Sequence, residues 1–292
     1  MLVIVGSIIV IASVLGGFVW AGGPPLVLFQ PAEILIIVGA AVGSLTISTP
    51  PSVLKRLMGQ VGRFFRGRPG KADYLELLGM QYQLFKVTQQ SGVMALETHV
   101  EDTNASPILS KYPRFLANHH AVSFLADSIK VIILGGIAPH DLEALMDEDL
   151  HVHHAEAMKP ATTLAKIGDA LPGLGIVAAV LGVVITMQSI DGPPAEIGHH
   201  VAAALVGTFL GILLCYGFVG PAATNLEHIV NDDAHYLVCI KTGLLAVYKG
   251  FPPAIAVEFA RRVLPHEVRP SFDETEQYCK AAAKGETAAM AA

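Results

Sequence analysis

The chain has few charged residues, and they are unevenly placed. Only 15% of its 292 residues are Asp, Glu, Lys or Arg, whereas 52% are hydrophobic. None of the 19 Lys and Arg residues falls in residues 1–54 or 167–240. This composition is typical of a membrane protein with several spans rather than of a soluble domain. Nucleic-acid binding would need a basic face, and the net charge of -6 argues against one.

The sequence also lacks the motifs of disulfide, metal and nucleotide chemistry. Its three cysteines have no metal-like spacing and imply no disulfide framework. It has no GxxxxGK[ST] phosphate loop and no recognisable nucleophile motif. His151, His153 and His154 could suggest a metal, but beside three acidic residues at 147–149 they are more typical of a solvated helix face. We therefore expect neither an enzyme nor a bound cofactor.

Four long apolar runs predict four membrane-spanning helices, because about 20 apolar residues cross a bilayer as a helix. The first run, residues 1–21, has no basic segment in front and no cleavage site, so we expect it to remain as a helix. The second run covers residues 34–47 with their flanks and ends before two prolines. The third covers residues 170–190, and the fourth runs from about residue 201 to residue 220.

The distribution of basic residues predicts the orientation of these spans. Basic residues crowd the exit of the second span, whereas the short loops inside each pair of spans have none. The positive-inside rule places those loops outside and both termini in the cytoplasm. The large polar segments have helical apolar periodicity, including Leu142, Leu145 and Met146, so the predicted fold is an all-α integral membrane protein.

The predicted regions are therefore four. Residues 1–50 carry spans 1 and 2, and residues 51–168 form a large helical cytoplasmic domain between the second and third spans. Residues 169–222 carry spans 3 and 4. Residues 223–292 form a cytoplasmic helical tail that breaks near Pro252 and is disordered from about Ala281.

The third span carries a stripe of small residues, which we call the small-residue stripe: Gly175, Ala179, Gly182 and Thr186. Their spacings of four, three and four put them on one helix face. In an apolar span such a face lets another helix approach closely. That helix could belong to the same chain or to another subunit.

The last two spans contain hydroxyls but no carboxylate at depth, because Asp169 and Glu196 lie at or beyond the helix ends. Ion pathways in membranes usually include an ionisable group at depth. If the chain conducts ions, we expect another subunit to supply the carboxylate, with its helix on the small-residue stripe.

Four segments carry a resemblance to a known family. Residues 171–184 (LPGLGIVAAVLGVV), 206–221 (VGTFLGILLCYGFVGP), 143–148 (EALMDE) and 252–259 (PPAIAVEF) closely resemble the flagellar motor stator A subunit family, MotA, within the MotA/TolQ/ExbB superfamily. The resemblance spans nearly the whole chain. It implies a proton channel formed by a pentameric ring of A chains around two helices of a B subunit, MotB. The B subunit would supply a membrane Asp and an anchor to peptidoglycan.

In this reading, ion flow turns the ring against the switch complex of the flagellar rotor and so drives motility. The alternative is a TolQ/ExbB-type energiser of an envelope transport system, which shares the ion-driven logic. Four spans with a cytoplasmic block between the second and third favour the flagellar motor over that alternative.

The resemblance also implies an ion pathway and a coupling device. Pro172 and Pro221 match prolines that couple ion passage to cytoplasmic movement, although a helix start and a helix end would also explain them. Sodium-type relatives carry hydroxyls where this chain has Ala179 and Gly207, next to Thr208. Because sodium needs several oxygen ligands, this loss favours protons as the coupling ion. Thr186 and Tyr216 supply further hydroxyls in the same spans.

The rotor contact is expected in the cytoplasmic domain, where the sequence departs from the family. The family's Glu is present as Glu97, but its Arg position is occupied by Gln89. Contact with the rotor should then rest on Glu97, helped by Lys86. Without the resemblance, Glu97 would be read as part of a solvated acidic face.

Overall fold

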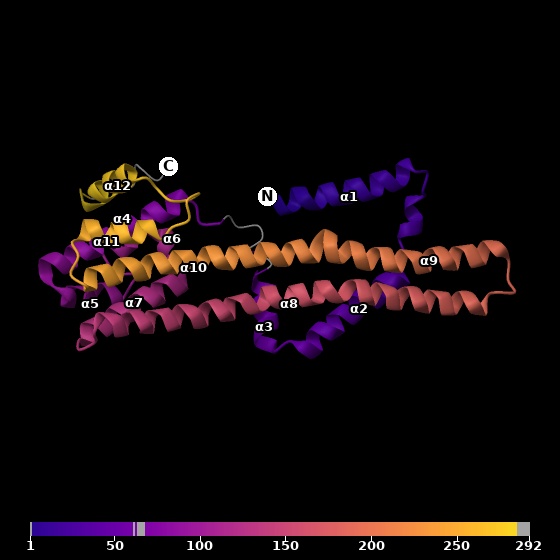
Figure 1. Ribbon diagram of the computed structural model, residues 1–292, viewed down its shortest axis with the longest axis horizontal. Coiled ribbons are helices and arrows are strands. Elements are labelled where there is room, and N and C mark those ends of the chain that lie inside the picture. The colour runs from indigo at the N-terminus through magenta and orange to yellow at the C-terminus, as the bar shows by residue number, and fades with distance from the viewer. Residues whose placement is uncertain (1, 61, 63–67, 285–292) are drawn as a thin grey trace. The chain divides into compact units, whose positions relative to one another are not determined.

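The structure, a computed structural model, describes residues 2–60, 62 and 68–284. Within these residues the regular structure is helical and no strand occurs, which confirms the all-α prediction. The chain divides into two compact units (Figure 1). We call them the membrane unit, Met1–Arg66 with Ala157–His228, and the polar unit, Gly67–Glu156 with Ile229–Ala292.

Four helical stretches are long and apolar enough to cross a membrane, as predicted. The fourth helix starts at Pro194, seven residues before the predicted position, because a proline fits the first turn of a helix, where no backbone donor is needed. The elements of the membrane unit are α1 (Leu2–Trp20), η1 (Pro25–Leu28), α2 (Pro31–Ser48), α3 (Pro51–Gln60), the later part of α8 (Pro139–Gln188), α9 (Pro194–Leu213), the π-helical η5 (Leu214–Val219) and the start of α10 (Gly220–Tyr248).

The membrane unit buries few side chains. Its main core joins α2, α8 and η5 through five residues: Ile37, Ala41, Leu171, Ala178 and Cys215. Helix α1 has no buried residue at all. Such exposed apolar helix surfaces need lipid or other subunits to cover them in a membrane.

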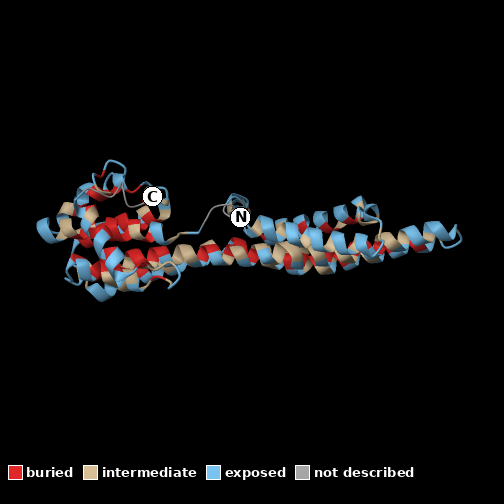
Figure 2. Ribbon diagram, turned by 90° about the horizontal axis from the view of Figure 1, so that it is seen from above, coloured by how far each residue is buried: buried red, intermediate tan, exposed pale blue. Residues whose placement is uncertain are grey.

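The polar unit holds the larger core (Figure 2). The apolar face of α4 is buried at Tyr74, Leu77, Leu78 and Phe85. In α8, Leu142 and Met146 are buried but Leu145 is half exposed, so the prediction for Leu145 is wrong. The elements of this unit are α4 (Lys71–Ser91), η3 (Val93–Leu96), α5 (Glu97–Val100), η4 (Leu109–Lys111), α6 (Pro113–Leu116), α7 (His119–Leu134), the start of α8, the later part of α10, α11 (Pro253–Arg262) and α12 (Phe272–Lys284).

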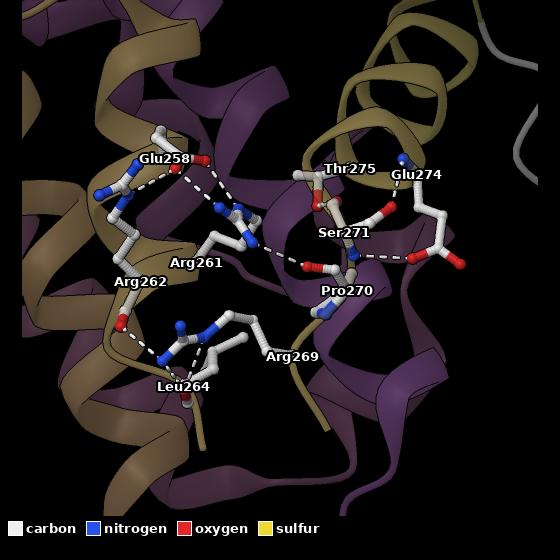
Figure 3. Close-up of polar contacts among 9 residues, drawn as sticks. All are labelled: Glu258, Arg261, Arg262, Leu264, Arg269, Pro270, Ser271, Glu274 and Thr275. Atoms are coloured by element: carbon white, nitrogen blue, oxygen red, sulfur yellow. Dashed lines mark hydrogen bonds and ion pairs between the residues drawn. The ribbon is translucent and has the colours of Figure 1, made fainter. Parts of the chain in front are cut away.

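The chain breaks between α10 and α11 at the predicted prolines, and an arginine network then holds the connection from α11 to α12 (Figure 3). Glu258 accepts hydrogen bonds from Arg261 and Arg262, with N–O distances of 2.7 to 2.8 Å. Arg261 also donates to the carbonyl of Pro270 at 2.9 Å. The hydrogen bond from Arg261 is the main cause that lowers the pKa of Glu258. The connection is therefore fixed by charge-assisted hydrogen bonds.

Helix α12 begins with a capping box. The Ser271 hydroxyl accepts from the Glu274 amide, and the Glu274 carboxylate accepts from the Ser271 amide at 2.7 Å. Lys71 of α4 donates to Glu274 at 2.7 Å and is the first cause that lowers the pKa of Glu274 to about 2. Because α12 continues to Lys284, disorder does not start at Ala281. The remainder of that prediction lies outside the described residues.

Candidate functional site

The small-residue stripe of α8 packs against α9 of the same chain. A β-carbon on Gly175 would lie 2.9 Å from the Gly207 carbonyl oxygen and 3.1 Å from the Gly211 Cα. One on Gly182 would lie 2.8 Å from the Ala204 β-carbon. Two helix backbones can meet this closely only where side chains are absent. The prediction that a partner's helix lies on this stripe is therefore wrong at these two glycines.

The predicted ion-pathway positions lie around this α8–α9 contact. Gly207 is buried, and a β-carbon on it would lie 3.1 Å from the Ala178 β-carbon and 3.4 Å from the Ala179 nitrogen. Thr208 follows it and is half-buried. Thr186 is buried, and its hydroxyl donates to the Gly182 carbonyl at 2.8 Å. The structure thus places Gly207 against Ala178 and Ala179, whereas Thr186 lies two turns further along α8 than Ala179.

One carboxylate at this place was missed by the sequence reasoning. Glu33, in the first turn of α2, is only 7% exposed, and its Cγ would lie 3.3 Å from a β-carbon on Gly207. The expectation concerned the last two spans, and it overlooked this carboxylate, which the second span brings beside α9. A Glu just inside an apolar run was a usable signal, but a first-turn Glu is also common at exposed helix starts. Sequence spacing could not reveal that α9 covers it.

Both predicted prolines lie inside continuous helical structure. Pro172 is in the interior of α8, so the helix-start alternative for it is wrong. Pro221 is the second residue of α10, which follows α9 and the π-helical η5 in one run from Pro194 to Tyr248, so it does not end a helix either. A single π-helical turn inside an α-helix is frequently found at functional sites.

The two prolines border one contact between α8 and η5. Pro172 has no N–H to offer the Gly168 carbonyl, its usual helical acceptor. A β-carbon on Gly168 would lie 3.2 Å from a Val219 methyl and 3.6 Å from the Gly220 nitrogen, directly before Pro221. Because Pro172 and Pro221 each lack a backbone N–H, two hydrogen-bond donors are missing from the backbone at this contact. Tyr216, within η5, is 72% exposed and makes its hydroxyl available at the surface of the unit.

The predicted rotor-contact residues lie on the surface of the polar unit. Gln89, in the last turn of α4, and Glu97, at the start of α5, are both exposed. Gly92 lies between them and has a φ of 79, a backbone conformation that residues other than glycine rarely adopt. The Lys86 ammonium lies 5.5 Å from the centre of the Tyr82 ring, a cation–π contact that restricts its reach.

A histidine pair, His120 of α7 and His153 of α8, lies in the polar unit. Their rings stack with centroids 3.4 Å apart and planes 13° apart. Burial lowers the pKa of both imidazoles, and the Asp149 and Asp233 carboxylates oppose this shift. Glu156 also opposes the shift at His153. Part of the predicted histidine face is thus packed rather than solvated.

These features define a class of protein: a helical multi-pass membrane subunit with a polar helical unit and closely packed spans at a candidate ion pathway. The sequence matches the family described as "MotA/TolQ/ExbB proton channel family" over residues 117–237. It also matches "Motility protein A N-terminal" over residues 4–92. The chain belongs to the motility protein A family.

Relatives are similar in sequence to this chain over nearly its whole length. Motility protein A of Salmonella typhimurium is 42% identical over 282 residues, covering 96% of each chain. Chemotaxis protein LafT of Vibrio parahaemolyticus is 36% identical, covering 94% of this chain and 96% of the relative. The chain is thus a flagellar motor stator subunit of an inner membrane and carries the proton channel domain of its family.

Solved structures share the fold. The C. jejuni MotAB structure gives a TM-score of 0.75 at 19% identity, covering 92% of this chain and 98% of the other. The MotAB stator complex from Bacillus subtilis gives 0.69 at 23% identity, covering 90% and 95%.

Proposed function

We propose that the chain assembles as a pentameric ring around two helices of a MotB-type subunit and converts proton flow into rotation of the flagellar rotor. Identity of 42% to a motility protein A over 96% of both chains is the observation that carries this proposal. The apolar and largely exposed surfaces of α1, α8 and α9 support it, because such surfaces need lipid or neighbouring subunits to cover them. The partner would supply a membrane Asp and the peptidoglycan anchor.

The proposed orientation puts both termini and the polar unit in the cytoplasm. It rests on the absence of Lys and Arg from the two short loops and their abundance after the second span. In this orientation Gln89 and Glu97 face the cytoplasm, where a rotor can reach them.

Protons are proposed as the coupling ion because Ala179 and Gly207 offer no side-chain oxygen beside Thr208. A dehydrated sodium ion needs several oxygen ligands, whereas a proton can move on a carboxylate and water. Each charge that crosses the membrane supplies about 2.3 kcal/mol per 100 mV to drive rotation.

A complementation experiment tests the function. The chain, expressed with a MotB-type subunit in a strain that lacks stators, should restore swimming, and the purified complex should have the mass of five A and two B chains. Failure to restore swimming while the B subunit is present would contradict the motor assignment. A partner from an envelope transport system would instead favour the TolQ/ExbB-type alternative.

The rotor contact is proposed to rest on Glu97, with Gln89 contributing little. Exposed ion pairs are each worth only about 0.2–1 kcal/mol, so several weak pairs would share the contact. Glu97→Lys should reduce stator recruitment to the motor, and a charge reversal on the rotor should partly restore it. Gln89→Ala is the matched control and should swim normally. Normal swimming of Glu97→Lys together with an immotile Gln89→Ala would overturn this assignment.

A further inference from the structure

Glu33 is held far from the ends of the helices that surround it. Its neighbour Gly207 lies thirteen residues after the start of α9, and Ala178, which meets Gly207, lies ten residues before the end of α8. At 1.5 Å per residue these positions are about 20 Å and about 15 Å along the helix axes. The Glu33 side chain therefore lies beside the middle of α9 and well inside the end of α8, although Glu33 belongs to the first turn of α2.

The carboxylate of Glu33 has no partner among the residues that the structure describes. No hydrogen bond or ion pair joins it to another described group, and its side chain is more than nine-tenths buried. No Lys or Arg occurs in residues 1–54 or 167–240, which supply α2, α9 and the part of α8 around Ala178. An ionised carboxylate is strongly disfavoured in an apolar site unless a cation or a proton compensates its charge.

Its immediate surroundings are small residues, and none of them is basic. Gly207 has no side chain, and a β-carbon there would press against both Glu33 and Ala178. Thr208 supplies a hydroxyl on the next residue, and Ala179 leaves the adjacent position of α8 small. The Glu33 side chain thus packs against Gly207, one of the positions at which the ion pathway is expected, and it reaches this position from a third helix, α2.

We propose that Glu33 is a cation-binding carboxylate of the ion pathway and takes up the coupling cation between α2, α8 and α9 before it reaches the carboxylate of the B subunit. This inference rests on the proposed ion-conducting function. The bound species is a proton or a small monovalent cation, since both neutralise a single carboxylate. Binding here raises the occupancy of the pathway when the external cation is scarce.

The test compares Glu33→Gln with Glu33→Asp in the full stator of motile cells. The glutamine has the same shape without the charge, whereas the aspartate keeps the charge on a shorter side chain. Glu196→Gln is the matched control, because it makes the same chemical change at a 53% exposed carboxylate at the start of α9. Rotation of tethered cells is measured against external pH, and fluorescently tagged chains report how many stators are recruited.

Glu33→Gln should be recruited normally, rotate at least about threefold more slowly, and reach half-maximal speed at an external pH lower by about one unit, which is tenfold more protons. Glu33→Asp should keep more than half the speed, and Glu196→Gln should match the unchanged chain. Wild-type speed and pH profile in Glu33→Gln would overturn the proposal. Loss of recruitment in Glu33→Gln would also overturn it, because Glu33 would then serve packing.

A second experiment, in which the external sodium concentration is varied, tests the Glu33 site independently of which ion drives rotation. If rotation stops when potassium replaces sodium, and Glu33→Gln needs about tenfold more sodium for half-maximal speed, the proton assignment fails while the site stands. If the unchanged chain drives no rotation with either ion, the ion-conducting function fails and the site fails with it.

Discussion

The contact between α8 and α9 gives a quantitative prediction for Gly175→Ala. The new β-carbon would lie 2.9 Å from the Gly207 carbonyl oxygen and 3.1 Å from the Gly211 Cα, whereas ordinary contacts begin at 3.4 Å. Both obstacles are backbone atoms, so the two helices must separate by about 0.5 Å locally. Overpacking of this kind costs about 1–3 kcal/mol. The higher helix propensity of Ala than of Gly offsets about 0.5–1 kcal/mol of this cost.

The net loss is therefore about 0–2.5 kcal/mol, and its middle value is roughly tenfold in the equilibrium between packed and separated helices. Gly173→Ala is the matched control, because no atom lies within 4 Å of a β-carbon there, only two residues away on the same helix. It should be neutral or slightly stabilising.

The assay is thermal unfolding of the detergent-solubilised complex with its B subunit, followed by swimming speed of the same variants. Gly175→Ala should unfold at a lower temperature than both the unchanged chain and Gly173→Ala. Equal unfolding temperatures for the two alanine variants would refute the reasoning, because only the close backbone approach distinguishes the two glycines.

Three further predictions concern the prolines, the coupling ion and the histidine pair. Pro172→Ala and Pro221→Ala should leave assembled complexes that fail to drive motility, since each restores a backbone donor at the α8–η5 contact; full swimming of both variants would remove the prolines from the mechanism. Replacing sodium by potassium at constant pH should leave swimming intact and an uncoupler should stop it, whereas the reverse pattern would overturn the proton assignment. Because burial lowers the pKa of His120 and His153, the folded state binds fewer protons than the unfolded state, so the unfolding temperature should fall as pH drops below about 6.5 and level off below the folded pKa values. Replacing both by Phe keeps stacked rings and should remove this acid loss; an unchanged acid loss would contradict its assignment to the pair.

The sequence by itself determined the number of spans and the helical class. Membrane insertion depends on the apolar length of each segment, which is a local property, and the runs that become α1 and α2 can be read directly. The prolines at 252 and 253 likewise fixed the break before α11, because a proline restricts its own backbone wherever it lies. The motifs at residues 171–184 and 206–221 were sufficient to indicate the family.

Only the tertiary structure decided which face of each helix is buried and which neighbouring helix it packs against. The small-residue stripe was compatible with a partner's helix or with α9, and only the packing of Gly175 on Gly207 settled this for the glycines. Pro172 could have started a helix, but α8 continues through it because the turns on both sides are held by packing against its neighbours. The sequence alone suggests that Glu33 is an ordinary exposed carboxylate in the first turn of a helix, and only its packing against α9 shows that it is buried. Burial depends on contacts between residues far apart in the chain, which no local pattern encodes.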